Sequence, residues 1–158
     1  MPVASRTLTR GEVAILRSIY GAGIRYDKVR IHSERWLFIF PKNRPMAPNG
    51  HIYFPGETYE EDFSSSHVSL NKKSIFVHEG AHLFQWYGLG WIVWARGPSD
   101  RNYDYTLVPG KAYSDYGLEA MGMIAQHYYV LKHGGRPANL PDKDHTVEDY
   151  AKLLPVTK

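Results

Sequence analysis

The sequence predicts a single α+β domain in which a small sheet packs on a pair of central helices. The length of 158 residues suits one domain, and 43% hydrophobic against 22% charged residues is typical of a globular chain with a core. Strand patterns precede most of the helical patterns, an order that indicates α+β. We expect one domain over residues 1–158, with an N-terminal helix (1–28), the sheet (29–70), the central helices (71–133) and a C-terminal linker with a short helix (134–158).

The first predicted helix begins at a capping box. Thr9 stands three residues before Glu12, the pattern in which each side chain bonds the backbone of the other residue. Apolar residues follow at helical spacing. Glycine favours helix ends, so we expect the helix to stop at Gly21.

Two segments between the first helix and the centre of the chain predict strands. Residues 29–40 (VRIHSERWLFIF) are rich in β-branched and aromatic residues, and we expect two short strands or one bent strand there. Residues 41–50 form a loop, and residues 51–54 (HIYF) form a strand that Pro55 stops. Residues 67–70 are a candidate for a further short strand.

The second half of the chain predicts helices. We expect one helix over residues 72–87, then a long connection over residues 88–115, a length that is often functional in a compact domain. A second helix is expected over residues 113–133, before a Gly-Gly pair. Thr146 opens a last short helix, which we expect to end at Pro155.

Composition excludes several classes of function. The chain has no cysteine, so disulfides play no part and a metal site must use histidine and carboxylate. Basic residues are scattered at a net charge of +3, so we expect no nucleic-acid partner. No apolar run approaches the roughly 20 residues of a membrane span. The first 21 residues lack the pattern of a secretory signal, so we expect synthesis in the cytoplasm.

The most informative stretch is His78-Glu79-Gly80-Ala81-His82. Residues four apart share one face of a helix, so His78 and His82 can bind one Zn²⁺ through two imidazoles. Glu79 borders this face and can accept a proton from a zinc-activated water without itself binding the metal. Composition alone gives roughly 0.02 such matches in a chain of this size. Gly80 is costly in a helix, which predicts that another element packs closely there. The alternative is a core helix with two satisfied histidines.

A catalytic zinc needs a third protein ligand and an open fourth position. Glu119 is the best candidate, because it is an acidic residue at the start of a largely apolar helix, where an unpaired carboxylate is costly to bury. Asp115 is the second candidate, one turn earlier. The alternative for Glu119 is a solvated first-turn glutamate that the helix dipole favours.

Hydrolysis of an amide also needs a donor to the oxyanion. Candidates near the second helix are Tyr113, Tyr116, His127 and Tyr128. The sequence does not choose among them, and any one could serve only in packing; we take Tyr116 and His127 as the working assignment. The strand at residues 51–54 could bind an extended peptide at a sheet edge or lie inside the sheet.

Three blocks of the sequence resemble one family in the same order: GHIYFPGETYEEDFSSS, FVHEGAHLFQWY and YGLEAMGMIAQHYY. This family is the HExxH zinc metallopeptidase domain found as an effector extension of VgrG-type spikes, or encoded near VgrG and Rhs elements, in type VI secretion systems. The resemblance covers residues 8–133. It implies a gluzincin-like zincin fold, zinc ligands His78, His82 and Glu119, and Glu79 as catalytic base.

The resemblance also implies a biological setting. A family member would be an antibacterial toxin that cleaves peptide bonds of protein or peptidoglycan in a competitor's periplasm, with an immunity protein and a VgrG-type spike as partners. One position departs from the pattern: gluzincins often place an aspartate four residues after the glutamate ligand, and here Met123 stands there. The alternative function is therefore a weak or silent zincin-fold module that serves as a binding or adaptor domain. A structural protein with a closed metal site is a third hypothesis.

Overall fold

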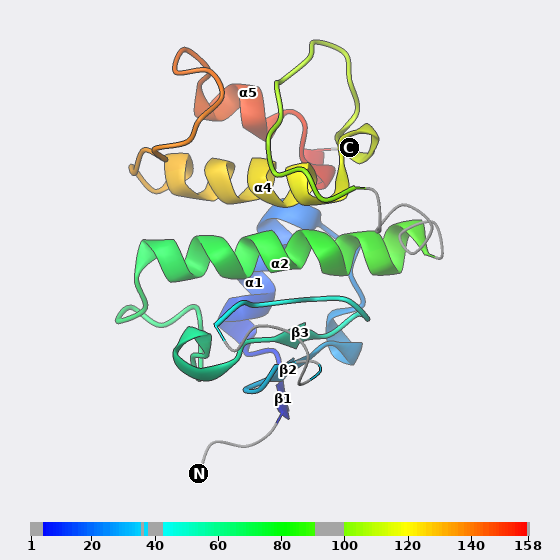
Figure 1. Ribbon diagram of the computed structural model, residues 1–158, viewed down its shortest axis with the longest axis vertical. Helices are drawn as coiled ribbons and strands as arrows, with labels where there is room; N and C mark the ends of the chain where they lie inside the picture. Colours follow the sequence, from blue (N-terminus) through cyan, green and yellow to red (C-terminus); the bar gives the residue numbers. More distant parts are fainter. Residues whose placement is uncertain (1–4, 36, 38–42, 91–99, 158) are drawn as a thin grey trace.

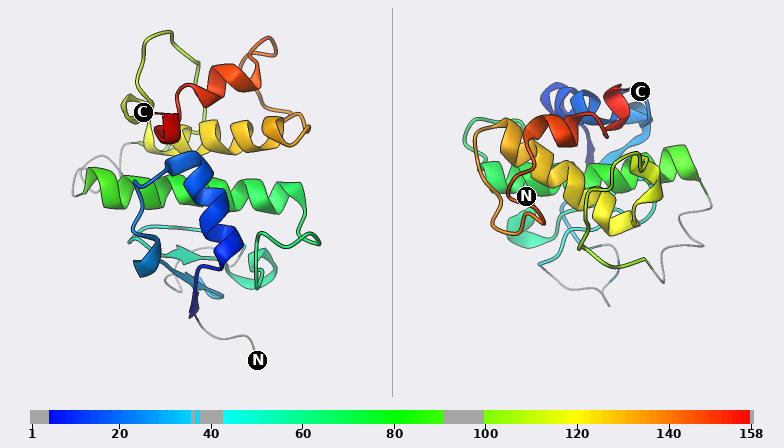
Figure 2. Two further views of the ribbon diagram at one scale, coloured as in Figure 1. Left: turned by 180° about the vertical axis from the view of Figure 1, so that it is seen from behind. Right: turned by 90° about the horizontal axis from the view of Figure 1, so that it is seen from above.

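The computed structural model describes residues 5–35, 37, 43–90 and 100–157. These residues form an α+β arrangement, as predicted (Figure 1). The sheet lies on one side of helix α2 (Leu70–Leu89), and helix α4 (Leu118–Lys132) lies on the other. Helix α1 (Arg10–Tyr20) crosses behind α2, and the short helix α5 (Val147–Ala151) packs on α4 (Figures 1 and 2).

The described strands form a three-stranded mixed sheet in the order β1-β2-β3. Strand β1 (Ser5–Thr7) runs antiparallel to β2 (Arg30–His32), which runs parallel to β3 (Ile52–Tyr53). Ile31 of β2 pairs with Ile52 of β3, and both side chains are fully buried. The sheet therefore contributes buried apolar side chains to the core that lies against α2.

The strand predictions are confirmed in part. Residues 51–54 contain β3, which lies at the end of the sheet order and takes an antiparallel bridge from Met46 to Tyr53 on its outer side. In the predicted strand at residues 29–40, Arg30–His32 is extended, and residues 36 and 38–40 lie outside the described residues. The strand expected at residues 67–70 is wrong, because the Ser69 side chain accepts a hydrogen bond from the Lys72 amide and caps α2.

Helix α1 has the predicted capping box between Thr9 and Glu12 and ends at Gly21, whose φ is 58°. It packs closely on α2 at Gly80. A Cβ at Gly80 would lie 2.6 Å from Leu16 Cδ2 and 2.9 Å from Tyr20 Cε2. The expectation that another element packs closely at Gly80 is therefore confirmed.

Helices α2 and α4 lie side by side and antiparallel, and they form the central pair (Figure 1). Helix α4 begins at Leu118, five residues later than predicted at 113. The segment before it forms the 3-10 turn η4 (Tyr113–Asp115), after which the backbone is extended through Gly117. The Leu118 amide donates to Asp100 Oδ2 at 2.9 Å, so a distant residue caps this helix.

The remaining elements are short. They are the 3-10 turns η1 (Tyr26–Lys28), η2 (Gly56–Thr58) and η5 (Pro155–Thr157). A capping box between Thr146 and Asp149 opens α5, as the sequence indicates. In the predicted connection, residues 91–99 lie outside the described residues. No helix in the described ranges combines the length and apolar character needed to cross a bilayer.

Candidate metal centre

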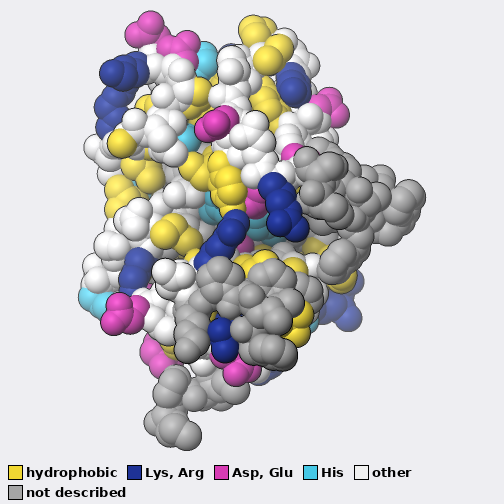
Figure 3. Space-filling model, viewed as in Figure 1, with side chains coloured by type: hydrophobic (Ala, Val, Ile, Leu, Met, Phe, Trp, Pro, Cys, Tyr) yellow, Lys and Arg dark blue, Asp and Glu magenta, His cyan; other side chains and the backbone are white. Residues whose placement is uncertain are grey.

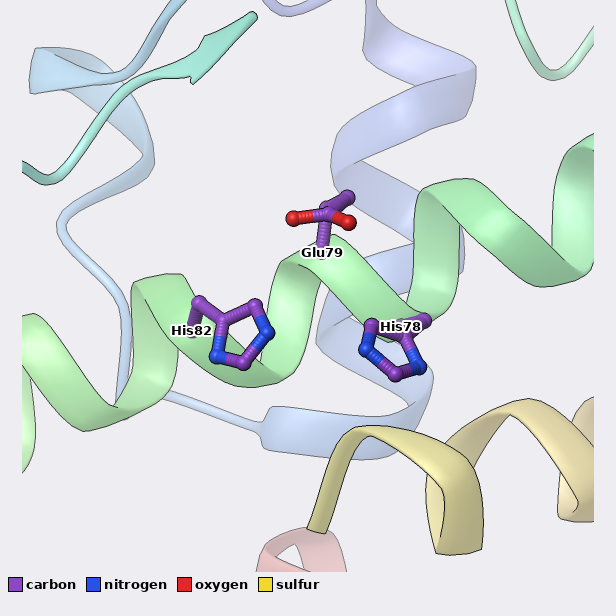
Figure 4. Close-up of side chains that lie close together, drawn as sticks. All are labelled: His78, Glu79 and His82. Carbon is purple, nitrogen blue, oxygen red and sulfur yellow. The ribbon is translucent and has the colours of Figure 1, made fainter. Parts of the chain in front are cut away.

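The two histidines of the motif lie one turn apart in the middle of α2, where helices α1 and α4 both pack against it. Figure 4 shows both imidazoles on one side of α2, with Glu79 projecting from the adjacent side. His78, Glu79 and His82 each place one potential ligand atom within 4.8 Å of the others. His78 and Glu79 are buried at 6% and 7% exposure. Local helix geometry thus brings two imidazoles and one carboxylate together on α2, as the sequence predicts.

Glu119, in the first turn of α4, adds a second carboxylate from the facing helix. Its Oε1 lies 2.6 Å from His82 Nε2 and 3.6 Å from His78 Nε2. The Glu119 side chain is only 15% exposed, so it is not a solvated surface glutamate. Asp115 lies in η4 and forms no ion pair with either histidine among the described residues.

The charges of this cluster are strongly coupled. Burial lowers the pKa of His82, but the hydrogen bond and charge of Glu119 outweigh it and raise that pKa to about 9. Burial raises the pKa of Glu119, but hydrogen bonds to His78 and His82 outweigh it and hold that pKa well below its usual range. The carboxylate is therefore ionised and ready to bind a cation. A cation bound at His82 must compete with a proton.

Glu79 has a different environment from Glu119. Its Oε2 is buried and has no hydrogen-bond partner among the described residues. Burial raises the pKa of Glu79, while the neighbouring His82 and His78 lower it and Glu119 raises it. A buried polar atom without a partner is costly unless a solvent molecule, ion or substrate satisfies it. An unpartnered carboxylate oxygen with a raised pKa beside two imidazoles is the arrangement that a general base requires.

Glutamine side chains orient both imidazoles. His78 Nδ1 donates to Gln126 Oε1 at 3.0 Å, and His82 Nδ1 donates to Gln85 Oε1 at 2.9 Å. Gln85 is itself held by its Nε2, which donates to the Leu118 carbonyl at 2.9 Å. With Nδ1 bonded to a glutamine, each histidine turns its Nε2 toward Glu119, and this is the nitrogen that could bind a metal once it has lost its proton. The two glutamines therefore take the orienting role of the aspartate that Met123 replaces.

A close approach of the two helices positions His78. A Cβ at Gly122 of α4 would lie 2.7 Å from both Cε1 and Nε2 of the His78 ring. This space exists only because Gly122 has no side chain. Two residues of α4 therefore fix the imidazole: Gly122 lies against the ring, and Gln126 bonds its Nδ1.

The donor set fits zinc chemically. Two imidazole nitrogens and a carboxylate oxygen are the set that catalytic zinc sites use when one position stays open. Ligand atoms at about 2.0–2.2 Å from a tetrahedral ion lie about 3.3 Å from one another. The Nε2–Oε1 distances of 2.6 Å and 3.6 Å lie on either side of that value.

The structure gives three of the four candidate oxyanion donors partners within the fold. The Tyr116 hydroxyl accepts from the Val108 amide at 3.0 Å, and Tyr113 donates to the Met121 carbonyl at 2.7 Å. His127 is 3% exposed; its Nδ1 bonds the Tyr105 hydroxyl at 2.6 Å and its Nε2 bonds Asn139 at 3.0 Å. Tyr128, the fourth candidate, is buried at 8% exposure beneath Lys132.

Two residues that the sequence did not indicate border the centre. The Tyr103 ring stacks on His78 with 5.9 Å between ring centroids, and its hydroxyl accepts a hydrogen bond from Arg44. Burial raises the pKa of Tyr103, and the nearby Glu119 raises it further. Both residues belong to irregular segments, where no periodicity signals a site.

Comparison with known proteins identifies relatives of this fold and sequence. No protein-family model matches the chain. The effector domain of Pseudomonas aeruginosa VgrG2b superposes with a TM-score of 0.69 at 31% sequence identity, over 84% of this chain and 79% of that domain. The chain belongs to the VgrG2b effector-domain family.

A second comparison places this family within a larger protein. The chain is 34% identical over 136 residues to the type VI secretion system spike protein VgrG2b of P. aeruginosa. The match covers 82% of this chain but only 13% of the spike protein. The similarity therefore concerns one part of VgrG2b, and it supports the VgrG-associated effector resemblance seen in the sequence.

Proposed function

We propose that the chain is a zinc-dependent metallopeptidase domain that acts as a type VI secretion effector. The observation that carries this proposal is the convergence of His78, His82 and Glu119 from two helices, beside the unpartnered carboxylate of Glu79. Two neutral imidazoles and one carboxylate would hold the ion and leave a position open to solvent or substrate.

Each residue has a distinct task in the proposed reaction. Zinc, when bound, supplies the Lewis acidity that makes water nucleophilic near neutral pH and polarises a peptide carbonyl. Glu79 accepts the proton of the attacking water and passes it to the leaving amine, which its position beside rather than among the imidazoles permits. Gln85 and Gln126 hold the two histidines in the tautomer that a metal needs.

The relatives suggest where the activity is used. Membership of the VgrG2b effector-domain family supports delivery with a VgrG-type spike. We propose a periplasmic target in the recipient cell, with protein or peptidoglycan peptides as substrate. An immunity protein in the producing cell would protect it from its own effector.

Zinc content and hydrolysis test the enzymatic proposal. The purified chain should contain one zinc per molecule, and it should cleave a peptide library or a peptidoglycan digest. Glu79→Gln should retain the zinc and lose at least about 100-fold in rate, the lower range for a general base. Glu61→Gln, which changes an exposed glutamate, is the matched control. Absence of zinc from protein prepared without chelators would overturn the proposal.

Export to the periplasm of a susceptible bacterium tests the effector role. We expect growth arrest from the native chain and from Glu61→Gln, but not from Glu79→Gln. Equal toxicity of all three would show that Glu79 chemistry is not the cause. Zinc binding without hydrolysis or toxicity would instead favour the adaptor module. The bond from Gln126 to His78 weighs against that alternative, because it orients the imidazole without an aspartate at position 123.

A further inference from the structure

Arg44 lies on a segment that two contacts anchor beside the metal centre. Met46 exchanges two backbone hydrogen bonds with Tyr53 of β3, at 3.0 Å and 2.8 Å. At the other end of the segment, the Tyr87 hydroxyl of α2 donates to the Gly50 carbonyl at 3.2 Å. The segment is thus fixed to both the sheet and the helix that carries His78 and His82.

Tyr103 reaches Arg44 from the segment that leads into α4. The Arg44 Nη2 donates to the Tyr103 hydroxyl, and its guanidinium lies over the Tyr103 ring at 6.0 Å from the centroid. The same ring stacks on His78, and the hydroxyl lies near Glu119. Contacts thus run from the metal centre through Tyr103 to Arg44, across two segments far apart in the sequence.

Positive charge lies close to histidine side chains on one face of the molecule. In the space-filling view, Lys and Arg side chains border histidine side chains near the middle of the face, with an acidic side chain among them (Figure 3). Arg44 is exposed and forms no ion pair with an acidic side chain in the described ranges. A guanidinium has five N–H donors, and the bond to Tyr103 uses one of them.

The charge of Arg44 lies one side chain away from the candidate metal centre. Its guanidinium bonds the hydroxyl of Tyr103, and the Tyr103 ring stacks on His78. Glu79 and Glu119 together would balance a divalent cation held between the histidines. The guanidinium would then keep its positive charge beside the site, and it would favour an anionic group on a peptide that binds there.

We propose that Arg44, positioned by Tyr103, binds a carboxylate of the peptide substrate beside the scissile bond. This inference rests on the proposed peptidase function and specifies its substrate class as acidic peptides. A carboxylate matches the planar fork of a guanidinium through two parallel hydrogen bonds, which an amide cannot reproduce. The carboxylate can come from an acidic side chain in a protein or from the carboxylates of a peptidoglycan stem peptide.

Peptide binding tests the proposal without requiring turnover. Zinc-loaded Glu79→Gln protein is titrated with labelled peptides that differ only by Glu or Gln next to the cleaved bond. We expect the Glu peptide to bind about tenfold more tightly, as a charge-assisted hydrogen bond predicts. Adding Arg44→Gln should abolish the preference, and adding Arg44→Glu should shift it toward a Lys peptide. Arg10→Gln makes the same change at an exposed arginine of α1, behind α2, and should leave the preference intact.

Stem peptides with free or amidated carboxylates form the second set of ligands. A preference confined to them assigns the carboxylate to peptidoglycan, whereas a preference confined to the side-chain pair assigns it to protein. Equal affinity for acidic and neutral peptides, or a preference that survives Arg44→Gln, overturns the inference. If Glu79→Gln loses hydrolysis but the peptides show no acidic preference, the peptidase proposal holds and this inference fails. If the preference depends on Arg44 but the native chain hydrolyses no peptide, this recognition holds and the peptidase proposal fails.

Tyr103 is tested as a positioning residue. Tyr103→Phe removes the acceptor of the Arg44 bond but keeps the ring on His78. We expect it to reduce the acidic preference about threefold, to act on KM more than on kcat, and to leave zinc content unchanged. A kcat loss with an unchanged KM would contradict this positioning role.

Discussion

Replacing Gly122 with alanine should weaken metal binding without unfolding the domain. The new methyl would lie 2.7 Å from Cε1 and Nε2 of His78, whereas carbon contacts need about 3.5–4.0 Å. The imidazole must therefore move by about 1 Å. Such a shift strains its 3.0 Å bond to Gln126 and displaces the nitrogen that faces the ion. We expect zinc affinity to fall about 10- to 100-fold, the range for loss of an orienting partner.

Gly88→Ala is the control for this prediction. Gly88 is also in a helix, but an added Cβ there meets nothing within 4 Å. Alanine should stabilise α2 by up to about 1 kcal/mol and leave zinc affinity unchanged. Chelator competition gives the zinc Kd, and thermal denaturation with excess chelator gives the stability. Equal zinc affinity in Gly122→Ala and Gly88→Ala would refute the close packing of α4 on His78.

Two further predictions concern the same centre. Gln126→Ala should lower zinc affinity about 10- to 100-fold, because it frees the His78 ring. Gln126→Glu keeps an acceptor for His78 Nδ1 and should retain the metal. Chelator competition measures both, and an equal loss of affinity in the two variants would contradict the orienting role. Because burial raises the pKa of Glu79 above its ordinary value of 4.5, the folded chain holds this proton more tightly than the unfolded chain, and stability falls as pH rises above that value. With chelator present, Glu79→Gln should therefore have a higher Tm than the native chain at pH 7. The difference in Tm should vanish below about pH 4. A constant difference in Tm between these pH values would contradict the raised pKa of Glu79.

The sequence predicted the features that depend on local geometry. The spacing of His78 and His82 fixes their shared face once the segment is helical, and the capping box at Thr9 needs only four residues. The burial of Glu119 beside the two histidines is also predictable, because an acidic residue in an apolar helix signals a buried partner. Each of these inferences uses an interaction whose partners are close in the sequence or whose burial is costly.

The features that the sequence missed depend on distant contacts. Helix α4 begins at Leu118 because Asp100, 18 residues away, caps it. Gln126 orients His78 from a helix 48 residues further along the chain. Arg44 and Tyr103 meet across irregular segments, where no period identifies which side chains face the site. Only tertiary packing brings such pairs together.

Crystallography of the zinc-loaded chain, with anomalous scattering at the zinc edge, tests the central claim most directly. We expect one peak per molecule, about 2.0–2.2 Å from the Nε2 atoms of His78 and His82 and from a Glu119 oxygen. Glu79 should remain outside coordination distance. A peak coordinated by Glu79 in place of Glu119, or no peak between the two histidines, would contradict the proposed centre.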